Sequence, residues 1–152
     1  MSSTEFKDFS FPMVTEEGME NIKLSEKAEG KNLLIAFFPA AYAPYCIQEM
    51  ESLNKEYTQY KEHNTEVIGI SGDLPWALAK FKADHKIPFP LVSDSKFEAA
   101  KAYNTYLENP MGNGMDFSNR GVFLIKDGKV AYEWRGEDPT KQPNFEEIRK
   151  HL

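Results

Sequence analysis

The sequence predicts an α/β domain in which a mixed β-sheet lies between helices. Unbroken apolar runs of strand length occupy residues 32–38, 65–70 and 121–125, a pattern typical of strands covered on both faces. Segments with apolar residues at helical spacing alternate with these runs. A tight turn at 126–129 joins the third run to the apolar segment 130–134, so the last two strands are expected to form a hairpin. Strands that alternate with helices and end in a hairpin indicate a mixed sheet.

The remaining elements follow from local signals along the chain. Segments 11–14 and 21–24 flank Glu16, Glu17 and Gly18, which predicts an N-terminal β-hairpin. A long amphipathic helix is predicted from apolar side chains that recur on one face. These residues are Cys46, Met50, Leu53, Tyr57 and Tyr60.

Three shorter helices are predicted from their N-terminal signals. The first begins at Asp73 with Pro75 just inside it, a combination of capping residue and early proline. Ser95 followed by Glu98 matches a capping box for the second. A last helix is expected after residues 143–144.

Length and composition limit the classes of protein that the chain can belong to. With 152 residues and 41% hydrophobic content, we expect one domain over 1–152. A net charge of −6 argues against a nucleic-acid partner. One cysteine excludes an internal disulfide framework and a cysteine-based zinc cluster. The N-terminal residues lack the features of a signal peptide, and no apolar stretch is long enough to span a bilayer. The sequence therefore predicts a cytoplasmic protein with no membrane association.

The single cysteine lies at a position where a thiol can become reactive. Phe38 ends a predicted buried strand, a proline-rich loop follows, and Cys46 falls in the first turn of the long helix. Free backbone N–H groups and the positive end of the helix dipole stabilise a thiolate there, so we expect a lowered pKa for Cys46. Pro39 and Pro44 stiffen the loop that presents the thiol.

The segment 37–50 resembles the peroxidatic loop of the peroxiredoxins, the alkyl hydroperoxide reductase and thiol-specific antioxidant family. The family pattern is a proline, three residues, a threonine or serine, two residues and the reactive cysteine. Pro39 and Cys46 match it in type and spacing, and Glu49 stands where the family often has glutamate. Residues 118–125 resemble the strand that supplies the family's active-site arginine, here Arg120.

The resemblance extends to 69–73 and 87–94 and so covers most of the chain. It is nearest to the bacterioferritin-comigratory and one-cysteine actinobacterial branch, and it implies a thioredoxin-like fold. The implied activity is a thiol peroxidase in which Cys46 attacks a hydroperoxide and becomes a sulfenic acid. Arg120 would stabilise the thiolate and the peroxide, and Pro39 would shield the thiolate from water. No cofactor or metal is implied, and peroxiredoxins commonly form homodimers.

Two residues depart from the family pattern. Ala43 stands where the family has the threonine or serine whose hydroxyl binds peroxide and thiolate. Glu51 stands where some relatives have a resolving cysteine, so an external thiol of the thioredoxin, glutaredoxin or low-molecular-weight type is expected as reductant. The loss of the hydroxyl also leaves a second interpretation, a peroxiredoxin-fold binding, scaffold or redox-sensor protein with weak peroxidase activity.

Simpler interpretations exist for each candidate residue. A lone cysteine is often a small buried hydrophobe, and an arginine at a strand start is often an exposed ion-pair residue. The matching segments favour Cys46 as nucleophile and Arg120 as its partner. For Glu49, complementing the helix dipole and orienting Arg120 remain equal alternatives. Tyr42 and Tyr45 are candidates for lining the peroxide pocket. The histidines are not spaced as a metal site would require.

Overall fold

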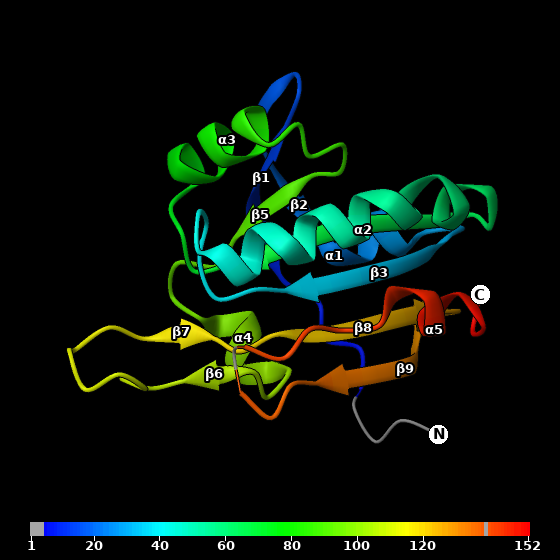
Figure 1. Ribbon diagram of the computed structural model, residues 1–152. Coiled ribbons are helices and arrows are strands. Elements are labelled where there is room, and N and C mark those ends of the chain that lie inside the picture. Colours follow the sequence, from blue (N-terminus) through cyan, green and yellow to red (C-terminus); the bar gives the residue numbers. More distant parts are fainter. Residues whose placement is uncertain (1–4, 139) are drawn as a thin grey trace.

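The computed structural model describes residues 5–138 and 140–152 and shows a seven-stranded mixed sheet between helices (Figure 1). The strand order is β2-β1-β5-β4-β3-β8-β9, with β6 and β7 paired in a separate small sheet. The β3–β4 and β4–β5 pairs are parallel, whereas the β1–β2, β1–β5, β3–β8 and β8–β9 pairs are antiparallel. The predicted mixed sheet with its N-terminal hairpin and C-terminal hairpin is confirmed.

The strands have the following bounds: β1 Ser10–Thr15, β2 Gly18–Lys23, β3 Asn32–Phe37, β4 Thr65–Ser71, β5 Leu91–Ser93, β6 Tyr106–Leu107, β7 Phe117–Ser118, β8 Gly121–Lys126 and β9 Lys129–Arg135. The helices are α1 Leu24–Ala28, α2 Pro44–Glu62, α3 Pro75–Asp84, α4 Glu98–Ala102 and α5 Phe145–Arg149.

The apolar runs of the sequence form the centre of the sheet because both faces are covered. Successive side chains of a strand point to opposite faces, and β3 divides its residues accordingly. Leu34 and Ala36 pack with residues of α2, α3 and α5 on one face, and Leu33 and Ile35 pack with residues of α1 and α4 on the other. The long helix α2 lies across the first face (Figure 1).

Two predicted helix starts differ from the structure. The N-cap of α4 is Phe97, in the left-handed region at φ 57°, and it makes no side-chain capping bond. The predicted capping box at Ser95 and Glu98 is therefore wrong, because Asp94 reaches past the turn and accepts the backbone N–H groups of Ala99 and Ala100.

For α3 the N-cap is Leu74 and not Asp73. The Asp73 carboxylate accepts hydrogen bonds from the Ser71 hydroxyl at 2.6 Å and from the backbone N–H of Ala41 at 2.8 Å. Asp73 thus ties the end of β4 to a distant loop. Pro75 begins the helix as predicted.

Within the described residues, no helix is long and apolar enough to cross a membrane.

Candidate active site

The sheet topology brings the two halves of the candidate site together. β3 and β8 are antiparallel neighbours, and Phe37 at the end of β3 pairs with Gly121 at the start of β8. Residues 38–43 form the β3–α2 loop. This loop therefore begins at the end of the sheet where Arg120 precedes β8. Cys46 and Arg120 are 74 positions apart in sequence (120 − 46), yet this register makes them neighbours.

Cys46 is fully buried in the first turn of α2. Ala43 is the N-cap residue, Pro44 occupies the first turn, and the Cys46 backbone N–H donates to the Ala43 carbonyl at 2.9 Å. Its side chain is 0% exposed and is a free thiol. The predicted placement of the cysteine at the helix start is confirmed.

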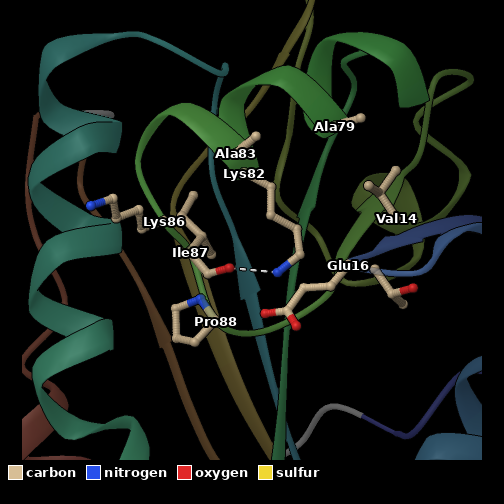
Figure 2. Close-up of a pocket in the computed structure, with 9 residues that line it drawn as sticks. Val14, Glu16, Ala79, Lys82, Ala83, Lys86, Ile87 and Pro88 are labelled. Carbon is tan, nitrogen blue, oxygen red and sulfur yellow. Dashed lines mark hydrogen bonds between the residues drawn. The ribbon is translucent and has the colours of Figure 1, made fainter.

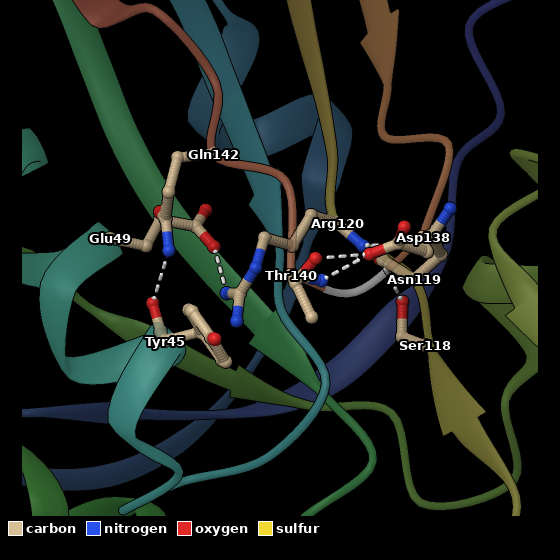
Figure 3. A network of polar contacts seen from close by, with 8 residues as sticks. All are labelled: Tyr45, Glu49, Ser118, Asn119, Arg120, Asp138, Thr140 and Gln142. Atoms are coloured by element: carbon tan, nitrogen blue, oxygen red, sulfur yellow. Dashed lines mark hydrogen bonds and ion pairs between the residues drawn. The ribbon is translucent and has the colours of Figure 1, made fainter. Parts of the chain in front are cut away.

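Arg120 and Glu49 form a buried ion pair (Figure 3), and Arg120 also makes a hydrogen bond with the Cys46 thiol. The Arg120 side chain is 1% exposed, and its Nη1 donates to Glu49 Oε1 at 2.6 Å. Glu49 is 0% exposed and lies three positions after Cys46, so both side chains project from neighbouring turns of α2. Of the two alternatives for Glu49, the structure shows contact with Arg120.

Hydrogen bonds at the start of β8 hold both the backbone N–H and the carbonyl of Arg120. Asn119 accepts the Arg120 N–H through Oδ1 at 2.9 Å, and its Nδ2 donates to the Gly136 carbonyl at 2.8 Å. The Gly136 N–H donates in turn to the Arg120 carbonyl at 3.1 Å. These bonds fix the backbone position of Arg120 and involve none of its guanidinium donors.

Burial dominates the electrostatics of the thiol. Burial raises the pKa of Cys46, and it outweighs a hydrogen bond from the Ala40 backbone and the charge and hydrogen bond of Arg120, which lower it. The expectation of a lowered pKa is therefore wrong, because the helix start and Arg120 do not compensate for the complete burial of the thiol.

For Glu49, as for Cys46, burial and the contact with Arg120 shift the pKa in opposite directions. Burial raises its pKa to about 7, and the charge and hydrogen bond of Arg120 act in the opposite direction. Its second oxygen, Oε2, has no hydrogen-bond partner within the described residues. A carboxyl group with one unpartnered buried oxygen holds a proton more readily than an exposed one.

The position of the missing hydroxyl is half-buried. Ala43 packs against the core cluster on the α2 face, and as N-cap it makes no side-chain bond to the helix. Tyr42 does not supply the hydroxyl, because its OH donates to Asp84 Oδ2 at 2.7 Å. Tyr45 is 47% exposed, and its backbone carbonyl accepts the Gln142 amide (Figure 3). Pro39 is half-buried and is the second residue after the end of β3.

Sequence reasoning missed the residues that hold the cysteine-bearing segment from outside. Asp73 accepts the Ala41 N–H, Asp84 accepts the Tyr42 hydroxyl, and Gln142 donates its amide to the Tyr45 carbonyl at 2.8 Å. These partners are 32, 42 and 97 positions away in sequence. No local pattern marks contacts of this range, because they follow from the packing of α3 and the C-terminal segment.

A pocket of about 510 Å³ lies elsewhere, between α3 and the β1–β2 hairpin (Figure 2). Lys82 lines it, but the Lys82 ammonium donates to the carbonyls of Ile87 and Phe89. Lys82 therefore holds the segment that follows α3 through these two hydrogen bonds. Among the described residues, no group of three or more histidine, cysteine, aspartate or glutamate side chains could hold a metal ion.

Comparison with known proteins agrees with this geometry. Residues 3–133 match the family model of the AhpC/TSA family. The chain is 31% identical over 118 residues to peroxiredoxin Bcp of Bacillus subtilis, covering 76% of this chain and 74% of that protein. It is 31% identical over 125 residues to the putative peroxiredoxin ycf42 of Porphyra purpurea, covering 78% of this chain but 59% of that protein.

The fold is similar to that of solved peroxiredoxins. The mitochondrial 2-Cys peroxiredoxin of Plasmodium falciparum superposes with a TM-score of 0.83 at 25% identity, covering 99% of this chain and 90% of that one. The thioredoxin-like arrangement implied by the resemblance is thus confirmed. Because the family model spans most of the sequence, this chain belongs to the AhpC/TSA family, the peroxiredoxins.

Proposed function

We propose that this protein is a one-cysteine thiol peroxidase in which Cys46 reduces a hydroperoxide and an external thiol restores it. The observation that carries the proposal is the Arg120 guanidinium, which is buried between Glu49 and the Cys46 thiol. A buried cation at a cysteine favours the thiolate, which is the nucleophile.

The reaction follows from these groups. The Cys46 thiolate attacks the distal oxygen of the hydroperoxide, the O–O bond breaks, and a sulfenic acid forms on Cys46. The electron pair of the broken bond leaves on the other oxygen, which takes up a proton and departs as water or an alcohol. Negative charge moves from sulfur to oxygen in this step, and Arg120 together with backbone N–H groups at the start of α2 stabilises it.

Restoration of the thiol needs two equivalents of reductant. A first external thiol displaces water from the sulfenic acid and forms a mixed disulfide, and a second thiol releases Cys46. The chain contains no second cysteine to replace the first of these. Thioredoxin-, glutaredoxin- and low-molecular-weight-type thiols all fit this chemistry.

Three of the site residues have assigned roles in this proposal. Glu49 orients Arg120 by accepting its Nη1 hydrogen bond, Pro39 shields the thiolate from water, and Ala43 marks the position where a hydroxyl donor is lacking. The absence of that donor is expected to lower the rate of peroxide reduction about 10- to 100-fold, which corresponds to about 1–3 kcal/mol.

The test is peroxide consumption with and without an added thiol, together with trapping of the oxidised cysteine. Dimedone and intact mass should identify a sulfenic acid on Cys46, and turnover should require the thiol. Cys46→Ser should abolish consumption. Non-reducing gels must accompany these data, since an intermolecular Cys46–Cys46 disulfide is the other available product. Cycling without added thiol would contradict the one-cysteine scheme.

A second function has two observations in its favour. Ala43 lacks the hydroxyl, and burial raises the pKa of Cys46, so a scaffold or redox-sensor protein with weak peroxidase activity is the alternative. In that case Cys46 would react with hydrogen peroxide only at the slow rate of a free thiol.

A further inference from the structure

Tyr42, in the β3–α2 loop, is attached to the end of α3. Its hydroxyl donates to Asp84 Oδ2 at 2.7 Å. Its ring packs edge-on against Phe81 and against His85, with centroids 5.1 and 5.9 Å away. The loop that leads to Cys46 is therefore fixed to a different helix by a side chain from its middle.

The backbone conformation of Tyr42 makes the loop depend on this attachment to α3. Tyr42 has φ +68°, a left-handed conformation that a residue with a bulky side chain adopts at an energetic cost. Such a conformation persists only where surrounding contacts hold it. If the contacts to α3 are weakened, the loop gains access to less strained backbone conformations.

Asp84 is suited to act as the fixed end of this attachment. It is the last residue of α3, and its other oxygen, Oδ1, accepts from Lys80 Nζ at 2.7 Å. Hydrogen bonds from Lys80 and then from Tyr42 are the main causes that lower the pKa of Asp84. The carboxylate therefore stays ionised around neutral pH, and a hydrogen bond to an ionised acceptor is stronger than one to a neutral group.

Access to Cys46 depends on the loop because the thiol is 0% exposed. This step rests on the proposed function, in which an external thiol, larger than a peroxide, must reach the sulfur. We propose that Asp84 is a positioning residue: through Tyr42 it holds the β3–α2 loop closed and sets the rate at which bulky thiols and thiol reagents reach Cys46.

The test measures the accessibility of reduced Cys46 and does not depend on peroxidase turnover. The alkylation rate with a polymer-linked maleimide is divided by the thiolate fraction of Cys46 at the same pH, taken from thiolate absorbance, so that differences in thiolate fraction cancel. Tyr42→Phe keeps the ring and removes the hydroxyl. We expect it to raise this ratio about three- to tenfold, because Tyr42 and Asp84 are both exposed and water weakens their hydrogen bond although its acceptor is ionised.

Tyr106→Phe is a matched control on the β6–β7 hairpin. Its hydroxyl also donates to an aspartate, Asp116 Oδ2, at 2.7 Å, and its ring also packs on a phenylalanine. Tyr106→Phe should leave the ratio at the parent value. Asp84→Ala should raise the ratio as Tyr42→Phe does, and the double variant should not exceed the larger single effect, because both changes remove one interaction.

Three results would overturn the proposal: an unchanged ratio in Tyr42→Phe, an equal rise in Tyr106→Phe, or effects that multiply in the double variant. Failure of the proposed peroxidase is distinguishable from these results. A protein whose Cys46 does not react with peroxide could still show the expected alkylation ratios, and an active peroxidase could show none of them.

Discussion

Ala43 is the N-cap of α2, and it also stands where the peroxiredoxin pattern has the active-site hydroxyl. We expect Ala43→Thr to raise the rate of Cys46 oxidation by hydrogen peroxide about 10- to 100-fold, because a hydroxyl donor acts on the charge that develops in the transition state. A threonine at an N-cap also stabilises a helix by about 1 kcal/mol. Stopped-flow oxidation and thermal unfolding measure the two effects.

Ala43→Val is the control for this prediction, since valine has the shape of threonine without its hydroxyl. It should give neither the faster oxidation nor the capping gain. If valine and threonine change the rate equally, the shape of the side chain accounts for the effect and the hydroxyl argument fails.

Arg120 is expected to be the main side chain that favours the Cys46 thiolate. Its charge and hydrogen bond lower the pKa of Cys46 against the effect of burial, so Arg120→Gln should raise this pKa further. At a fixed pH below that pKa, the variant holds less thiolate and reacts more slowly. Thiolate absorbance against pH measures the shift. An unchanged pKa in Arg120→Gln would show that the guanidinium does not act on the sulfur.

Glu49 should make stability depend on pH in the neutral range. Burial raises its pKa from 4.5 to about 7, so between these values the folded protein holds a proton that the unfolded chain releases. The free energy of unfolding therefore falls as pH rises through this window, by on the order of 3 kcal/mol in total. Above the window the contribution is constant.

Glu49→Gln cannot titrate and isolates this effect. The stability of the parent minus that of Glu49→Gln, from urea unfolding at several pH values, should decrease between pH 4.5 and 7 as described. A difference that stays constant over this range would mean that Arg120 keeps Glu49 ionised throughout.

Among the residues of the site, those in one sequence segment were predictable and those brought in by packing were not. Cys46 and Glu49 share the start of a helix with a clear apolar pattern, and Arg120 was identified through its resemblance to a family segment. Asp84 and Gln142 contact the cysteine-bearing segment from 42 and 97 positions away, and nothing in their own neighbourhoods indicates it.

At the scale of elements, the attachment of α5 to α2 depends on a buried tyrosine. Tyr60 is 0% exposed, and its hydroxyl donates to the Phe145 carbonyl at 2.7 Å. Tyr60→Phe leaves that carbonyl without its partner and should cost about 1–3 kcal/mol of unfolding free energy. Tyr132→Phe is the control, since the Tyr132 hydroxyl makes no hydrogen bond within the described residues. Equal stability losses in both variants would contradict the role of the bond.

Long apolar patterns predicted their elements well, whereas some short elements were missed. The strands at 32–38, 65–70 and 121–125 agree with β3, β4 and β8 to within one residue at each end. By contrast, β5 and α1 have three and five residues, too few to show a period. Asp94 caps α4 from outside the local motif, which is why the pattern at Ser95 was misleading.

At the scale of the whole molecule, the site exists because the sheet is mixed. Because β3 and β8 are antiparallel, the end of β3 lies beside the start of β8. The thiol and the guanidinium both lie at this end of the strand pair. The sequence predicted a mixed sheet from its final hairpin, but the neighbours of each strand depend on long-range packing that no local pattern encodes.

The most direct test compares the reactivity of the Cys46 thiol in the folded protein with its reactivity in the unfolded chain. The rate constant for oxidation of Cys46 by hydrogen peroxide, expressed per thiolate, is measured by stopped flow in the folded protein and in the urea-unfolded chain. If Arg120 and the start of α2 stabilise the charge that moves onto the peroxide, the folded protein should react at least about 100-fold faster. Equal rate constants in the two states would contradict the assignment of Cys46 and Arg120 as a peroxidase site.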